Sequence, residues 1–184
     1  MRFAIQPLDA SIHDRGAFSC GTASIDRYLR EIAAQAAVHF RSGTRVLVQV
    51  DQPKTILGFH TICQLEFRDE EMDPTTARAL KIQNLKRIPA VLLGQLAVAA
   101  TCQGQGLGRM LLDDAFKKAL YASCILGGAL LVTDPIDEKA RSFYLHYEFQ
   151  ELQGAGERLF MAMKTLEAAY PAVVKAARAA VAKA

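Results

Sequence analysis

The sequence predicts a mixed α/β fold in which a central, mainly antiparallel sheet carries helices on both faces. In the first half, the β-rich runs "RVLVQV" and "TILGFHTICQLEF" flank the turn signal "DQPK", a pattern that predicts an antiparallel hairpin. In the second half, the runs "AVLLGQLAVA" and "GALLVTD" are apolar almost throughout, as strands covered on both faces are. Helical patterns alternate with these later strands. The strands are therefore expected to form one mixed sheet, with the helices packed on its faces.

The N-terminal half begins with a predicted strand at "MRFAIQPL", followed by a predicted helix. Residues 21–24, "GTAS", supply N-cap chemistry, and apolar side chains recur at helical spacing over residues 25–40. A short helix is predicted within residues 75–85, "TTARALKIQNL". These elements place helical cover beside the predicted hairpin.

The C-terminal half contains the strongest helical pattern, at residues 107–122. Its apolar residues form one broad stripe, and the pairs Asp113–Lys117 and Asp114–Lys118 place an acid four residues before a base. A short helix at 137–147 and a late strand at 158–166 follow. We expect one domain over residues 1–165 and an alanine-rich, peripheral helical tail over 166–184, interrupted or started at Pro171.

The composition is that of a globular protein, with 51% hydrophobic and 22% charged residues in 184. We find no apolar run of membrane-spanning length and no signal-peptide pattern, so we expect a cytoplasmic protein without a membrane partner. The four cysteines are widely spaced, form no CxxC pair and predict no disulfide or zinc framework. The four histidines show no metal-ligand spacing either, so we expect no metal site.

Charge is unevenly distributed along the chain. The segment from Pro74 to Leu112 contains no acid, while five basic residues lie in it: Arg78, Lys81, Lys86, Arg87 and Arg109. Such a segment suits an anionic ligand or partner, and an ordinary solvated basic face is the alternative.

Residues 103–109, "QGQGLGR", place three glycines directly before and within the start of the predicted helix. Bare backbone at a helix N-terminus presents free N–H groups and the positive end of the helix dipole, which together bind phosphate. The Walker pattern GxxxxGK[ST] is absent, and GxGxxG fails because Arg109 stands at its third glycine. The pattern Q-x-x-G-x-G fits instead.

The loop, the strand before it and the later helix "ARSFYLHYEF" together resemble the GNAT family of acetyl-CoA-dependent N-acetyltransferases. The resemblance implies a sheet that splays beside the strand, the pantetheine arm along that strand, and the pyrophosphate on the loop. Glu148 stands where the family usually has glycine. The expected acetyl-CoA contacts are Leu96, Ala97, Val98, Gln103, Gly104, Gln105, Gly106, Leu107, Gly108, Arg109 and Phe143.

A narrower resemblance extends over residues 1–164. "FSCG" before "IDRYLREIAAQA", with "ILGFHTI" and "IPAVLLGQLAV", looks like the GNAT toxins of bacterial toxin–antitoxin operons. This resemblance implies that the protein acetylates aminoacyl-tRNA and forms a homodimer. It also implies a ribbon-helix-helix antitoxin as partner, with operator DNA bound only through that antitoxin. The acceptor-facing cations would be Lys81, Lys86, Arg87 and Arg45. A GNAT for a small amine, antibiotic or protein N-terminus and a non-catalytic acetyl-CoA-binding regulator are the alternatives.

The same resemblance assigns catalytic roles to Val98, whose backbone N–H would polarise the thioester carbonyl, and to Tyr144, which would protonate coenzyme A sulfur. Packing against the sheet is the alternative role for Tyr144. The strand 90–99 offers no acid as a base, with Gln95 where a carboxylate might stand. An α-amine, with a pKa near ~7.7–8, needs a base less than a lysine does near ~10.4. Glu66 or water is the alternative base.

Overall fold

The computed structural model describes residues 2–68, 72–83, 85–152 and 156–183. It divides into a first unit, residues 1–63 and 94–115, and a second unit, residues 64–93 and 116–184. Two strands and one long helix contribute to both units, and each unit is described by itself below.

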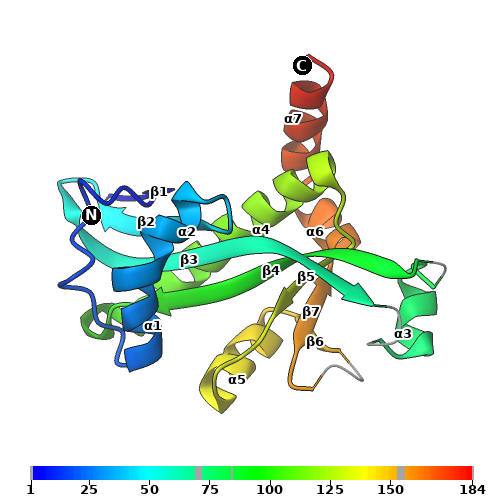
Figure 1. The fold of residues 1–184 in the computed structure, drawn as a ribbon, viewed down its shortest axis with the longest axis horizontal. Helices are drawn as coiled ribbons and strands as arrows, with labels where there is room; N and C mark the ends of the chain where they lie inside the picture. Colours follow the sequence, from blue (N-terminus) through cyan, green and yellow to red (C-terminus); the bar gives the residue numbers. More distant parts are fainter. Residues whose placement is uncertain (1, 69–71, 84, 153–155, 184) are drawn as a thin grey trace. The chain divides into compact units, whose positions relative to one another are not determined.

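Seven strands form one hydrogen-bonded sheet in the order β1-β2-β3-β4-β5-β7-β6 (Figure 1). Their bounds are β1 Phe3–Pro7, β2 Gly43–Gln49, β3 Gln52–Arg68, β4 Arg87–Val98, β5 Leu130–Thr133, β6 Gln150–Glu151 and β7 Leu159–Ala162. The pairs β1–β2, β2–β3, β5–β7 and β6–β7 are antiparallel, while β4 and β5 are parallel. The predicted mixed, mainly antiparallel sheet and its hairpin are therefore confirmed.

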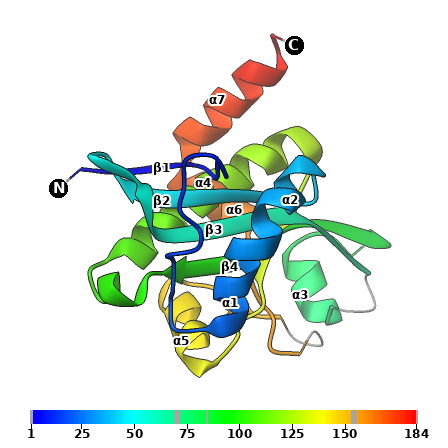
Figure 2. The same cartoon turned by 60° about the vertical axis from the view of Figure 1, so that its left-hand side comes forward.

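The first unit covers its strands on both faces. The predicted helix at 25–40 is confirmed in place, but it consists of α1 (Ala23–Arg27), a π-helical turn η1 (Tyr28–Ile32) and α2 (Ala33–Val38). Its buried residues Leu29 and Ala33 pack in a cluster with Val46 and Val48 of β2. Leu47, between those two, lies in a separate cluster with the start of the long helix α4 (Leu107–Leu126). Alternation along β2 thus assigns one face to α1–α2 and the other to α4 (Figure 2).

The second unit contains α3 (Pro74–Ala79), α5 (Glu138–His146), α6 (Met163–Ala169) and α7 (Pro171–Val181). Its core cluster joins residues of β4, β5 and β7 to those around α3, including Ile88, Leu130, Val132 and Phe160. Among the helices that the structure describes, none has the length and apolarity that a membrane crossing requires.

Two predicted elements in the second unit end early. The strand predicted at 158–166 stops at Ala162, because its partner β5 begins opposite it at Leu130 and offers no further pairing. The following "MKTLEAA" consists mostly of good helix formers and becomes α6. The helix predicted at 75–85 stops at Ala79, and Lys81 adopts a left-handed φ of +58° that a helix cannot continue.

The alanine-rich segment is helical, as expected, and Pro171 occupies the first turn of α7. Leu166, Val174 and Ala177 are buried, so both of the last helices contribute side chains to the packed interior. A separate, peripheral tail from residue 166 stays a prediction.

Candidate active site

The glycine loop of the first unit connects the end of β4 at Val98 to the start of α4 at Leu107. Gly104 and Gly106 have φ values of +76° and +78°, a conformation that only glycine adopts without strain. A Cβ placed on either residue would meet no other atom within 4 Å, so the outer side of the loop is open. The amides of Arg109 and Met110 donate to the Gly106 carbonyl at 3.1 and 3.4 Å, whereas those of Leu107 and Gly108, in the first turn, have no acceptor within the helix and are available as donors. This arrangement fits a pyrophosphate.

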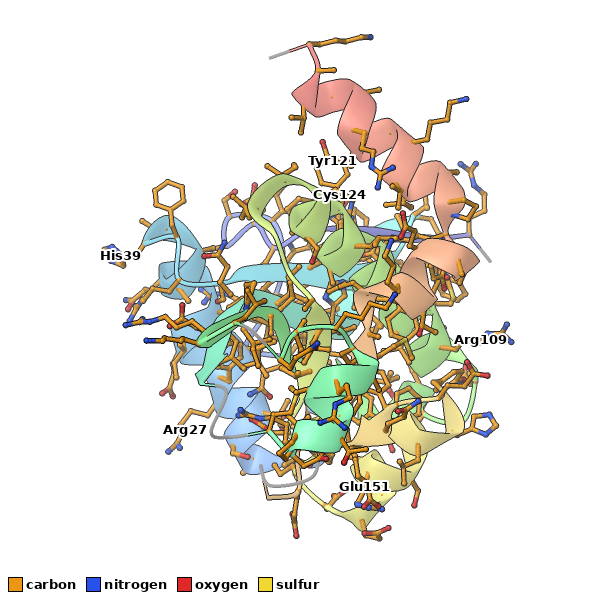
Figure 3. The ribbon with its side chains drawn as sticks, turned by 90° about the vertical axis from the view of Figure 1, so that its right-hand side faces the viewer. Arg27, His39, Arg109, Tyr121, Cys124 and Glu151 are labelled. Atoms are coloured by element: carbon orange, nitrogen blue, oxygen red, sulfur yellow. The ribbon has the colours of Figure 1, made fainter. Side chains whose placement is uncertain are left out.

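The side chain of Gln103 holds this loop in place through two hydrogen bonds. Its side-chain amide Nε2 donates to the carbonyl oxygens of Cys20, at 3.0 Å, and Val98, at 3.2 Å. The side chain therefore ties the loop to β4 and to the segment before α1, a role that the sequence did not reveal. Arg109, one turn into α4, is exposed and extends away from the helix (Figure 3).

β4 presents a backbone edge beside the loop. The Ala99 N–H donates to the Leu57 carbonyl of β3 at 2.9 Å. Because successive N–H groups of a strand point to opposite edges, the Val98 N–H points away from β3. The pairs of β4 with β5 run only from Ala90 to Leu92, so the later residues of β4 lie beyond this ladder.

Gly58 is a further residue of this unit that the sequence analysis passed over. A Cβ there would lie 2.8 Å from the Ala97 carbonyl oxygen and 2.8 Å from Leu111. Glycine at this position lets β4 and α4 approach β3 closely. A glycine inside a β-rich run was the signal available in "TILGFHTI".

In the second unit, α5 brings Tyr144 into the interior with only 6% exposure. Phe143 and Phe149 contact its ring edge to face, with ring centroids 5.3 Å from it in each case. His146, two residues further along α5, is exposed, because each residue of a helix turns the side chain by about 100°. Glu148, at the position where the family usually has glycine, has a φ of +66°. The glycine-type turn after α5 thus survives the substitution.

The phenol of Tyr144 lies beside Thr133 of β5. Burial raises the pKa of Tyr144 to about 12, while its hydrogen bond with Thr133 acts in the opposite direction. Thr133 is itself 2% exposed and donates its hydroxyl hydrogen to the Leu93 carbonyl at 3.0 Å. The Thr133 hydroxyl lowers the pKa of Tyr144 because it can donate to the phenolate oxygen when the phenol ionises.

The basic residues predicted to face a substrate have different surroundings. Lys81 and Lys86 are exposed, and the exposed Arg87 pairs with Glu66 at 2.7 Å. Arg45 is partly buried, donates to Asp114 and to the Ile5 carbonyl, both at 2.7 Å, and so acts first as a structural cation.

Asp114 also bonds the fully buried His60 at 2.7 Å, so its carboxylate turns into the first unit rather than along α4 to Lys118. The helix-surface pair predicted for Asp114 is replaced by this buried network. Burial alone would raise the pKa of Asp114, but the hydrogen bond of His60 and the charge of Arg45 outweigh it, and the pKa is lowered.

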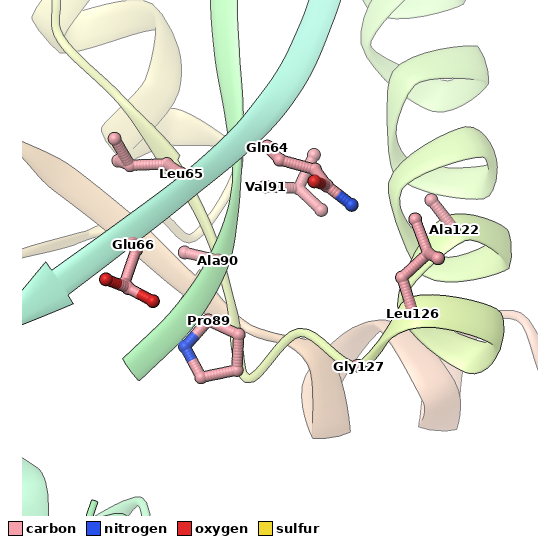
Figure 4. A pocket seen from close by; sticks show the side chains of 9 residues that line it. All are labelled: Gln64, Leu65, Glu66, Pro89, Ala90, Val91, Ala122, Leu126 and Gly127. Carbon is pink, nitrogen blue, oxygen red and sulfur yellow. The ribbon is translucent and has the colours of Figure 1, made fainter. Parts of the chain in front are cut away.

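A hollow of about 320 Å³ lies in the second unit between the strands β3 and β4 and the last turns of α4. Gln64 and Val91 face Ala122 and Leu126 across it (Figure 4). Of the residues named from the sequence, only Glu66 lines it, so this hollow does not mark the predicted site. Over the described residues, no group of histidine, cysteine, aspartate or glutamate side chains is arranged to hold a metal.

Comparison with known proteins supports the same chemistry. Residues 42–151 match the model of an acetyltransferase (GNAT) domain. A relative from Mycobacterium tuberculosis (strain ATCC 25618 / H37Rv), called a tRNA-acetylating toxin, is 30% identical over 137 residues, 74% of this chain and 78% of that protein.

Two solved structures are similar over nearly the whole chain. AtaT complexed with acetyl-methionyl-tRNAfMet has a TM-score of 0.82 and 27% identity, with 92% of this chain and 99% of that chain covered. A tyrosine-to-phenylalanine mutant of AtaT, bound to the C-terminus of the antitoxin AtaR and to acetyl-CoA, has a TM-score of 0.76 and 26% identity, with 91% and 98% covered. The AtaT–AtaR complex has also been solved bound to DNA.

Proposed function

The chain belongs to the GNAT acetyltransferases, and on that premise we propose that it is a toxin that acetylates the α-amine of aminoacyl-tRNA and so blocks translation in the cytoplasm. The observation that carries the proposal is the likeness, over 92% of the chain, to a toxin solved with an acetylated aminoacyl-tRNA. The residues of the chain fit the steps of this reaction as follows.

Acetyl-CoA supplies an activated acetyl group as a thioester. The loop from Gln103 to Gly108 and the start of α4 would hold its pyrophosphate through backbone N–H groups, with Arg109 adding charge from the surface. Leu96, Ala97 and Val98 of β4, together with Phe143, would contact the rest of the molecule. The open side of Gly104 and Gly106 supports this assignment, because any side chain there would occupy the approach to the amides.

The Val98 N–H is the proposed oxyanion donor. It points to the edge of β4 that does not face β3, so it is not needed for the β3–β4 ladder. A backbone donor held in a strand needs no reorganisation when negative charge develops on the carbonyl oxygen.

Tyr144 is the proposed proton donor to the departing sulfur. With its pKa at about 12, the phenol stays protonated at every physiological pH, so the proton is always in place. The raised pKa also makes this phenol a weaker acid than a solvated tyrosine. Thr133 offsets part of this loss of acidity, because its hydroxyl can turn from Leu93 and donate to the phenolate as the proton leaves.

The acceptor amine is proposed to enter without a dedicated base. Glu66, the alternative base, is exposed and forms a surface ion pair with Arg87. An α-amine already has a substantial neutral fraction near pH 7, which favours an aminoacyl ester over a lysine side chain.

We propose further that an antitoxin of the ribbon-helix-helix class neutralises the chain, that operator DNA is bound only through it, and that the free toxin is a homodimer. The structures of AtaT with its antitoxin AtaR, and of the AtaT–AtaR complex with DNA, support a neutralising antitoxin and DNA binding by the complex.

The test is to incubate the protein with radiolabelled acetyl-CoA and total aminoacyl-tRNA and to locate the label. We expect label at the 3′ end of charged tRNA and none on deacylated tRNA, which has no α-amine. Label on a small polyamine, with charged tRNA left unlabelled, would contradict the proposal in favour of a small-amine acetyltransferase.

A further inference from the structure

Phe40, just after α2 in the first unit, is 97% exposed, more than any other large hydrophobic residue described as exposed. It also adopts a left-handed conformation, with a φ of +55°. A bulky side chain in that region is disfavoured, and glycine is the usual residue at this position after a helix. Folding therefore gains nothing from this ring and is opposed by it.

Among the described residues, two others that are not glycine have a positive φ, and they do not share this anomaly. Lys81 and Glu148 follow α3 and α5 with φ values of +58° and +66°. Both are charged, and a charged side chain belongs in water whatever its backbone does. Phe40 alone of these three presents an apolar ring to solvent, so the ring calls for a functional reason.

The backbone beneath the ring is fixed. The Phe40 N–H donates to Ala37 at 3.1 Å, and the Arg41 N–H donates to Ala36 at 2.8 Å. The Tyr28 hydroxyl lies 3.3 Å from Ser42 Oγ. The ring therefore projects from a hydrogen-bonded helix end.

The chain around the ring contains a cation and no acid. No acid occurs from Ile32 to Val50, and the exposed His39 and Arg41 flank Phe40 directly. Arg27 and Arg30 are exposed on the same helical segment, with Glu31 as the exposed acid beside them. Figure 3 shows Arg27 and His39 extending outward from this segment. An exposed aromatic ring beside an arginine suits nucleic acid, in which a base stacks on the ring while a phosphate meets the charge.

We propose that Phe40 stacks on an unpaired base of the charged tRNA, while Arg41 contacts a neighbouring phosphate. The proposal rests on the proposed function and adds a substrate contact away from the reacting groups. We favour RNA over a protein partner because Phe40 is followed directly by the exposed Arg41 and lies in a stretch of chain without acids, from Ile32 to Val50.

The experiment measures binding of total aminoacyl-tRNA without acetyl-CoA, over a range of salt concentrations. Phe40→Ala should lower the affinity by about 5- to 150-fold, the range for losing one base–aromatic stack, with the salt slope unchanged. Phe40→Trp should keep the affinity. Arg41→Gln should instead lower the salt slope by about 0.7–0.9, as expected for one lost phosphate contact.

Phe40→Gly provides the sharpest variant, because stability and binding should move in opposite directions. Removing the left-handed strain should raise Tm by about 2–4 °C, while tRNA affinity falls as in the alanine variant. Tyr121→Ala is the matched control, since it removes a 38% exposed ring from α4 and should leave tRNA affinity unchanged.

Unchanged tRNA affinity of Phe40→Ala, in a protein that labels charged tRNA, would overturn the stacking proposal and leave the proposed function standing. If that variant instead dissociates a dimer, or loses only the antitoxin, the ring serves a protein interface and the proposal is wrong. A wild-type protein that labels no charged tRNA would overturn the proposed function itself.

Discussion

In the proposed reaction, the glycine loop of the first unit and Tyr144 of the second unit would meet opposite structural requirements. The loop acts through backbone, lies open to solvent, and depends on side chains being absent at Gly104 and Gly106. Tyr144 acts through a side chain, is almost completely buried, and depends on neighbours such as Thr133 being present. The difference indicates that binding and proton transfer can be disabled separately.

The loop should be the more sensitive part to a single substitution. We expect Gly106→Val to abolish acetyl-CoA binding, measured by calorimetry, because the side chain both strains the backbone and covers the amides. Gly127→Val is the matched control, since Gly127 has a φ of +80° and equally open space but lies in the second unit, after α4. Equal loss of binding in both variants would mean that strain alone is responsible.

Tyr144→Phe should leave acetyl-CoA affinity unchanged and lower turnover by about 10²–10⁴-fold, the range for losing one acid catalyst. The ring and its aromatic contacts stay, so thermal stability serves as the control for folding. Near-normal turnover would show that water protonates the departing sulfur.

Thr133→Val should lower kcat by about 10- to 100-fold without raising KM, because the phenolate loses its hydrogen-bond donor. Thr133→Ser keeps the hydroxyl and should restore most of the activity. This rescue would contradict a merely structural role for Thr133. If both variants instead lose activity in proportion to their loss of stability, the role is structural. In the Tyr144→Phe background, Thr133→Val should have almost no further effect.

The exposed cations should matter less and act in a different way. Replacing Lys86 and Arg87 with glutamine should weaken aminoacyl-tRNA binding and reduce its salt slope by about one to two. The change should be nearer one, because Glu66 already offsets Arg87. Acetyl-CoA affinity should not change, and Lys118→Gln is the matched control on α4. An unchanged salt slope would show that Lys86 and Arg87 do not contact tRNA phosphates.

The smallest effect at neutral pH concerns the stability that Asp114 of α4 contributes through its bonds with Arg45 and His60. Its pKa is lowered in the folded state, so its contribution to stability is fully present above the ordinary value of 3.8 and is lost as pH falls through the lowered pKa. Chemical denaturation at pH 7 and pH 5 should therefore give similar contributions from Asp114. Below pH 4 the wild type should lose free energy of unfolding that Asp114→Asn, already without the charge, does not lose.

The sequence by itself determined the family, the mixed sheet and the loop. A glycine-rich turn before a strong helical pattern is a local feature, and local geometry is what neighbouring residues specify. The position of Tyr144 was also available, because it lies within a short recognisable motif, and its helix formed where the spacing predicted.

The tertiary structure decided how individual side chains are used. Arg45 and Asp114 were predicted as surface charges, yet they are 69 positions apart in the chain and meet around His60, a pairing that no local pattern encodes. Thr133, which bonds the phenol of Tyr144, likewise contacts the carbonyl of Leu93, a residue of another strand that lies 40 positions away in the chain. Phe40 looked like the last apolar residue of an amphipathic helix, but α2 ends at Val38, and the left-handed turn that follows points the ring into solvent. Burial depends on where a helix stops, and that point is set by its packing.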